Sequence, residues 1–229
     1  TLVKEIKGRI KLDNSRLPFK DTNYEYWTKT TKSGNYSIRL RKKIDSKKIE
    51  IYWDGNKEHK LSKSEYFGIG DLAVSYNDKL LGYSLDLKGS EYFTIYIRQI
   101  SNNKLVSSKI NDTSGNIIFS LDDKYIFYSK LDNNHRPKTI FRHEIGTPIK
   151  NDILIFEEKN DRFTVGIDIT SDEKYFIISS GDHTTSEIYY FLSDDQAPKP
   201  QLFQKAKEGI IYSINSWGKY FYINTNYKA

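Results

Sequence analysis

The sequence predicts an all-β fold, and three observations support this prediction. The 229 residues include 18 Tyr and 12 Phe but only 13 Gly and 5 Pro, a composition that favours strands over helices. One strand-turn-strand pattern occurs four times, as VSYNDKLLGYS (74–84), FSLDDKYIFYS (119–129), ITSDEKYFIIS (169–179) and INSWGKYFYIN (214–224). The lysines of the pattern, at positions 79, 124, 174 and 219, are separated by 45, 50 and 45 residues. A period of roughly 40–50 residues with several strands in each period is typical of β-propeller blades.

The first part of the chain is predicted to hold a short segment and a partial blade. Residues 1–22 form a polar N-terminal segment that is either helical or extended, and the partial propeller spans residues 23–229. Three strands are expected in the first blade, residues 23–56, at 24–27, 37–41 and 48–54. This blade therefore lacks one strand.

Three complete blades and a second partial blade follow. The complete blades occupy residues 66–110, 116–158 and 163–206, and the last blade, at 210–229, has strands at 210–215 and 219–224. In the second blade the predicted strands are 70–76, 80–87, 92–100 and 104–110, with turns at Asn77-Asp78, Lys88-Gly89 and Asn102-Asn103. We therefore expect an incomplete β-propeller of about four blades, each a four-stranded antiparallel sheet. Its open blade edges are candidates for self-association.

The net charge of +6 comes from the first part of the chain. Residues 1–50 carry 14 Lys and Arg against 6 Asp and Glu, and the densest cluster lies in the hairpin SIRLRKKIDSKKIEIYW (37–53). Because no nucleic-acid-binding motif accompanies this cluster, we interpret it as a solvated hairpin whose lysines discourage edge pairing, and we expect no nucleic-acid partner. No run of about 18 apolar residues is present, so no membrane partner is expected, and the cytoplasm is the default location.

The sequence contains no self-contained active site. The nearest string to the G-x-S-x-G nucleophile elbow of α/β-hydrolases, Gly82-Tyr83-Ser84-Leu85-Asp86, lacks the second glycine and lies in a repeat strand. No H-E-x-x-H, P-loop or calcium-loop pattern occurs, and the four histidines lie in different segments. We therefore expect no catalytic residue, no metal and no cofactor in this chain.

Several stretches resemble the propeller of oligopeptidase B, a group of serine peptidases in the prolyl oligopeptidase family. They are EYFGIGDLAVSYNDKLLGYSLDLKGSEYFTIYIR (65–98), NDTSG (111–115), IFYSKLDNNHRPKTIFRHEIGT (126–147), NDRFTVG (160–166) and HTTSEI (183–188). The resemblance implies a seven-bladed propeller that covers an α/β-hydrolase domain and restricts access to short peptides, which the intact enzyme cleaves after Lys or Arg. Relative to that family, the chain corresponds to an N-terminal portion of the propeller without the catalytic domain, inactive by itself.

The resemblance also implies three site residues at the interdomain surface. Glu91 matches an acidic position that the family pairs with a catalytic-domain arginine near bound substrate, and Thr113 and Ser114 are candidates for the same cavity. Arg136 is expected to pair with a carboxylate as a structural residue. The alternative function is an independent interaction module that keeps the propeller surface and has no part in proteolysis.

Overall fold

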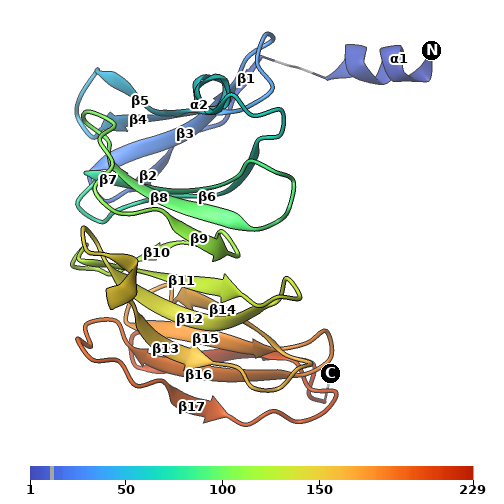
Figure 1. Ribbon diagram of the computed structural model, residues 1–229, viewed down its shortest axis with the longest axis vertical. Helices are drawn as coiled ribbons and strands as arrows, with labels where there is room; N and C mark the ends of the chain where they lie inside the picture. The colour runs from blue at the N-terminus through green and yellow to red at the C-terminus, as the bar shows by residue number, and fades with distance from the viewer. Residues whose placement is uncertain (11–12, 229) are drawn as a thin grey trace. The chain divides into compact units, whose positions relative to one another are not determined.

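The computed structural model describes residues 1–10 and 13–228, and it divides the chain into two compact units, Thr1–Phe67 and Gly68–Ala229. Nearly all regular elements in the described residues are antiparallel strands, as the composition predicts (Figure 1). No helix among them is long and apolar enough to cross a membrane.

The first unit contains a five-stranded sheet and two helices. Its elements are α1 (Leu2–Arg9), β1 (Asn14–Ser15), β2 (Phe19–Asp21), β3 (Tyr24–Thr30), β4 (Ile38–Lys43), β5 (Ile49–Asp54) and α2 (Gly55–Ser62). The three strands predicted in this blade are present as β3, β4 and β5. The prediction that the blade lacks a strand is wrong, because β1 and β2 both pair with β3. The Phe19 ring stacks on Tyr26, a buried residue of β3, with 5.9 Å between ring centroids. A three-residue strand gives little periodicity in the sequence, so this contact was not predictable from the pattern.

Helix α2 was also not predicted, although its start has a clear local cause. The Asp54 carboxylate accepts hydrogen bonds from the backbone N–H groups of Asn56 and Lys57, which caps the first turn. A side chain at Gly55 would place its Cβ 2.7 Å from that of Tyr36, so only glycine fits there. The helix ends at Lys63, which has a left-handed backbone with φ of 56°.

The second unit contains three four-stranded groups and a final hairpin. The strands of the first two groups are β6 (Gly68–Val74), β7 (Leu80–Asp86), β8 (Phe93–Gln99), β9 (Ile110–Thr113), β10 (Ile118–Phe119), β11 (Tyr125–Leu131), β12 (Pro137–Glu144) and β13 (Ile153–Glu157). The third group and the hairpin are β14 (Thr164–Ile169), β15 (Tyr175–Gly181), β16 (Ser186–Leu192), β17 (Gln201–Gln204), β18 (Tyr212–Trp217) and β19 (Tyr220–Thr225), and a short 3-10 helix covers Ile149–Asn151. No sheet closes on itself in the described residues.

The outermost strand of the first group differs from the prediction. A continuous strand was expected at 104–110, but the structure has one bridge between Leu105 and Arg98 and then β9, which pairs Ile110 with Ile95. Val106 still donates its N–H to the Ile97 carbonyl oxygen, and residues 107–109 leave the ladder. The same strand continues to Thr113, whose pairing with Lys130 joins the first two groups into one eight-stranded sheet.

The core of the second unit lies between neighbouring groups of strands. Along β11, Ile126 and Tyr128 belong to a cluster shared with β8 and β9, whereas Phe127 belongs to a cluster shared with β14 and β15. Successive side chains of a strand point to opposite faces, so β11 is buried on both. A third cluster, formed by Ile177, Ile188 and Tyr212, packs β18 against β15 and β16.

The repeated sequence pattern encodes one turn that recurs along the second unit. The residue before each repeat lysine has a left-handed backbone, with φ of 60° at Asp78, 57° at Asp123, 57° at Glu173 and 67° at Gly218. In the first three turns a hydroxyl accepts the N–H of the residue five positions on, in the pairs Ser75–Leu80, Ser120–Tyr125 and Thr170–Tyr175. The predicted turns at Asn77-Asp78, Lys88-Gly89 and Asn102-Asn103 are confirmed, because Asp78, Gly89 and Asn103 all have positive φ.

Candidate functional site

The candidate residues lie at one end of the strands of the second unit. Consecutive strands are antiparallel, so the β7–β8 loop, the β9–β10 connection and the β11–β12 loop all leave the sheet at the same end. We call this the loop end. The repeat turns that precede Lys79, Lys124, Lys174 and Lys219 lie at the opposite end. The loop end therefore brings together the segments that hold Glu91, Thr113 and Ser114.

Glu91 lies in the β7–β8 loop, on a backbone that one buried carboxylate organises. Asp86 is only 2% exposed, and its two oxygens accept the N–H groups of Lys88 (2.8 Å), Gly89 (3.0 Å) and Glu91 (2.7 Å). Burial raises the pKa of Asp86, but these backbone hydrogen bonds outweigh it, and the pKa lies below its usual value. Glu91 itself has φ of 61°, and its exposed carboxylate has no partner among the described residues. The loop thus presents an unpaired negative charge on a fixed backbone.

The side chains of Thr113 and Ser114, unlike that of Glu91, make hydrogen bonds within the fold. Thr113 is completely buried, and its hydroxyl donates to the Phe93 carbonyl oxygen at 2.9 Å and accepts the Gly115 N–H at 3.2 Å. The partly exposed Ser114 shares a hydrogen bond of 2.6 Å with the Ser129 hydroxyl. The Thr113 hydroxyl therefore has both of its hydrogen-bonding roles filled within the fold, while Ser114 keeps access to solvent.

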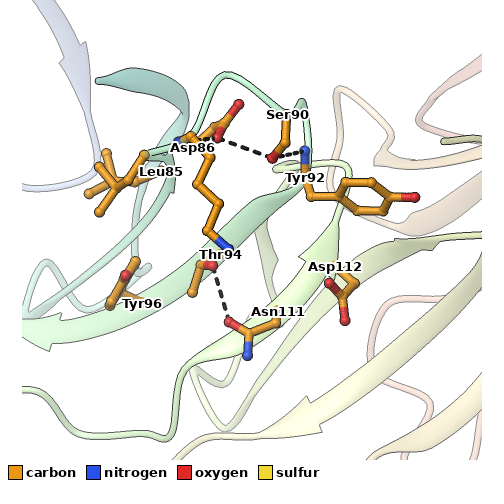
Figure 2. Close-up of a pocket in the computed structure, with 10 residues that line it drawn as sticks. Leu85, Asp86, Ser90, Tyr92, Thr94, Tyr96, Asn111 and Asp112 are labelled. Carbon is orange, nitrogen blue, oxygen red and sulfur yellow. Dashed lines mark hydrogen bonds between the residues drawn. The ribbon is translucent and has the colours of Figure 1, made fainter. Parts of the chain in front are cut away.

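A cavity of about 350 Å³ opens beside Glu91 in the same loop (Figure 2). Its lining residues come from β7, β8, their connecting loop and β9, and they are Leu85, Asp86, Leu87, Lys88, Ser90, Tyr92, Thr94, Tyr96, Asn111 and Asp112. Figure 2 shows Ser90 and Tyr92 on one side and Asn111 and Asp112 on the other, with the Thr94 hydroxyl bonded to Asn111 between them. No sequence pattern indicates this cavity, because its two sides meet through the irregular β8–β9 pairing.

Asp86 has counterparts in the next two groups of strands, and the sequence patterns did not predict these counterparts. Asp132 opens the β11–β12 loop and accepts the N–H groups of Asn134 and Arg136, and Asp182 opens the β15–β16 loop and accepts those of Thr184 and Thr185. Hydrogen bonding lowers the pKa of both carboxyl groups, and the pKa of Asp182 falls to about 2. The predicted pairing of Arg136 with a carboxylate is confirmed, at 3.4 Å from Asp132.

A Ser–His–Asp arrangement is present in the second unit, also unpredicted. His143 Nδ1 lies 2.6 Å from Asp152 Oδ1, and His143 Nε2 is hydrogen-bonded to the Ser107 hydroxyl. His143 is fully buried, and the nearby Gly146 N–H donates to Ser107 Oγ itself at 3.2 Å rather than to a position a substrate oxygen would take. Hydrolysis by such a triad requires donors for the developing oxyanion. The arrangement therefore serves the fold.

The basic hairpin of the first unit has internal carboxylate partners. Arg41 is buried, pairs with Glu50 at 3.2 Å, and covers the Tyr24 ring at 4.3 Å, while Lys42 pairs with Glu25 at 2.8 Å. Two of its cations are thus neutralised within the sheet. This arrangement supports the interpretation as a structural hairpin.

The antiparallel groups, each packed face to face on the next, define a β-propeller type of domain. The model of the prolyl oligopeptidase N-terminal beta-propeller domain matches residues 1–229, and the chain belongs to this family. The predicted resemblance to the prolyl oligopeptidase family is therefore confirmed.

Individual relatives agree with this assignment. Protease 2 of Moraxella lacunata is 27% identical over 226 residues, which are 95% of this chain and 32% of that protein. Dipeptidyl aminopeptidase BI of Pseudoxanthomonas mexicana is 27% identical over 202 residues, covering 82% of this chain and 28% of that protein. The solved structure of oligopeptidase B from Leishmania major has a TM-score of 0.91 at 22% identity, covering 97% of this chain and 32% of that one. Oligopeptidase B from Trypanosoma brucei, with covalently bound antipain, has a TM-score of 0.88 at 23% identity, over the same shares. The chain thus spans about a third of the length of these relatives.

Proposed function

We propose that this chain is the noncatalytic propeller portion of an oligopeptidase B-like serine peptidase that cleaves small peptides after Lys or Arg. The observation that carries the proposal is the match of the whole chain to the N-terminal propeller of peptidases about three times as long. In this role the propeller restricts access to an α/β-hydrolase domain, and the chain has no hydrolytic activity alone. The cytoplasmic location, the absence of nucleic-acid and membrane partners, and self-association through open strand edges remain predictions.

Glu91 is the residue that we propose contacts the catalytic domain. Its carboxylate is exposed and unpaired among the described residues, and its backbone is fixed by the bond to Asp86. A rigidly held carboxylate at a domain surface suits a bidentate arginine partner, because little side-chain and backbone freedom is lost when the pair forms. Ser114, at the same end of the strands, is a second candidate for the interdomain surface. Thr113 then acts by holding the β9–β10 connection against Phe93.

The proposal is tested in a chimera in which this chain replaces the matching third of a full-length oligopeptidase B. We expect the chimera to cleave short arginyl and lysyl reporter peptides. Replacing Glu91 by Ala should lower kcat/KM about tenfold, because removing one member of a partly buried charge pair costs about 1–3 kcal/mol. The matched control is Glu173→Ala, since Glu173 is an exposed carboxylate with positive φ at the opposite end of the strands.

Two results would contradict the proposal. The first is a chimera that is folded, as shown by cooperative thermal unfolding, but cleaves neither reporter. This result would contradict the assignment to a Lys/Arg-directed peptidase. The second is equal kcat/KM for the Glu91→Ala and Glu173→Ala chimeras, which would mean that Glu91 makes no contact that matters for catalysis. The isolated chain is expected not to hydrolyse the reporters and not to react with serine-directed phosphonates, and labelling of Ser107 would contradict its structural role.

A further inference from the structure

The cavity beside Glu91 has the features of a second binding site, separate from the proposed Glu91 contact. Among its lining residues, Leu85 and Asp86 are buried and Tyr92 and Tyr96 are partly buried. Its exposed lining residues, which we call the rim, are Lys88, Asn111 and Asp112. Glu91 is not among the lining residues. A volume of about 350 Å³ lies at the lower end of the range of small-ligand sites, roughly 300–1,000 Å³. The cavity therefore fits a small molecule or a few residues of a peptide.

The walls of this cavity are fixed before any ligand arrives. Asp86 ties down the loop through three backbone N–H groups, and the Ser90 hydroxyl also points to it at 3.4 Å. The Tyr92 hydroxyl donates to the Asp132 carbonyl oxygen at 3.1 Å, and its ring lies 4.1 Å from that of His135. Both contacts of Tyr92 come from the next group of strands. Binding consequently requires little reorganisation of the loop.

The rim carries one cation and one anion that the fold leaves unused. The Lys88 ammonium and the Asp112 carboxylate have no hydrogen-bond or ion-pair partner in the described part of the chain, although they line the same cavity. Asp112 has φ of 60°, an unusual conformation for a residue in a strand, and such residues cluster at functional sites. The Asp86 carboxylate is different, because its oxygens are occupied by the loop. The accessible charges are thus one of each sign.

We propose that this cavity binds a short peptide with free termini, such as a product of peptide cleavage. Lys88 takes the terminal carboxylate, Asp112 takes the terminal ammonium, and the rings of Tyr92 and Tyr96 pack against the side chains. A phosphorylated ligand fits less well, since a single lysine would have to offset the repulsion of Asp86 and Asp112. The Lys109 ammonium lies 5.4 Å from the centroid of the Tyr96 ring, within the distance of a cation–π contact. The site does not depend on the Glu91 pairing, so either proposal can fail alone.

The test is a titration of the ¹⁵N-labelled chain with four forms of one dipeptide, followed by NMR. The forms are Ala-Phe, its N-acetyl derivative, its C-terminal amide and the doubly blocked peptide. We expect Ala-Phe to shift the amide signals of Lys88, Ser90 and Asp112 saturably, and each blocked end to weaken binding about fivefold, the order expected for an exposed ion pair. Lys88→Gln should abolish the preference for the free carboxylate, and Asp112→Asn the preference for the free ammonium.

The variants are chosen so that the fold is kept. Asparagine tolerates a left-handed backbone, so Asp112→Asn preserves the conformation at φ of 60°. Lys104→Gln and Asp168→Asn are the matched controls, because both residues are exposed and neither lines the cavity. Shifts that do not saturate, equal affinity for free and doubly blocked peptides, or equal effects of the rim and control variants would each overturn the proposal.

Discussion

At the scale of single residues, His143 shows how completely a buried polar group can be satisfied in this fold. The Asp152 carboxylate lies 2.6 Å from His143 Nδ1 and accepts the Tyr128 hydroxyl at 2.8 Å. Ser107 completes the network at His143 Nε2. Burial, followed by the contact with Asp152, raises the pKa of Tyr128. Two side chains, Tyr128 and His143, therefore depend directly on one carboxylate, and Ser107 depends on it through His143.

Removing that carboxylate is expected to be costly. Asp152→Ala leaves the Tyr128 hydroxyl and the His143 Nδ1–H without acceptors in a buried site, and we expect a loss of about 2–4 kcal/mol in the free energy of unfolding. Urea denaturation at neutral pH measures the loss. Asp194→Ala is the control, because Asp194 is exposed and its carboxylate has no partner in the described residues. A loss no larger than that of the control would mean that the network contributes nothing to stability.

At the scale of elements, the repeat turn was predicted from the sequence, but the contact between turns was not. The repeated strand-turn-strand pattern around the four lysines marks the turn positions. It does not show that the Asp123 carboxylate accepts the N–H groups of Tyr76 (2.7 Å) and Asn77 (2.8 Å), which lie one repeat earlier. Such a contact depends on how neighbouring groups pack. For the same reason the cavity beside Glu91 was not predicted. The strand β2 was missed because three residues give little periodicity, whereas the long alternating strands were predicted.

Two substitutions at the same turn position should have opposite effects. Glu173 and Asp123 both have φ of 57°, but the Glu173 side chain is exposed and makes no contact in the described residues. Glu173→Gly should therefore stabilise the protein by about 0.5–1 kcal/mol, because glycine removes the strain of the left-handed backbone. Asp123→Gly relieves the same strain but leaves two backbone N–H groups unpaired, so a net loss of about 1–2 kcal/mol is expected. Urea denaturation of both variants, against the parent chain, checks the signs, and a shared sign would contradict the role of Asp123.

At the scale of the whole molecule, stability in the second unit is shared between neighbours. Each apolar cluster is built by two adjacent groups of strands, and β11 contributes to two of them. The repeats are therefore expected to add their stabilities through nearest-neighbour interfaces. The sequence predicted this array from its period. The period does not predict the loop-end carboxylates Asp86, Asp132 and Asp182, because the loops that follow them differ in length and composition.

These three carboxylates should make the chain sensitive to acid. All three have a pKa below the usual value, which for Asp182 falls to about 2, chiefly through the Thr184 N–H and then Arg162. In the unfolded chain an aspartate titrates near 3.9, so between about pH 4 and 2 the unfolded state binds more protons than the folded state. The stability that these groups supply is accordingly complete above about pH 5 and is lost as the pH falls through the folded pKa values.

Asp182→Asn should flatten this pH dependence while keeping the loop intact, because the asparagine oxygen still accepts the N–H groups of Thr184 and Thr185. The urea midpoint, measured from pH 5 to pH 2.5, should fall less steeply for this variant than for the parent chain. Asp168→Asn is the matched control, because Asp168 is exposed and, within the described residues, its carboxylate accepts only the N–H of the next residue, Ile169. If Asp182→Asn and Asp168→Asn follow the same curve as the parent, the acid sensitivity arises elsewhere. A smaller slope in Asp182→Asn alone would identify the β15–β16 loop as one origin of acid unfolding.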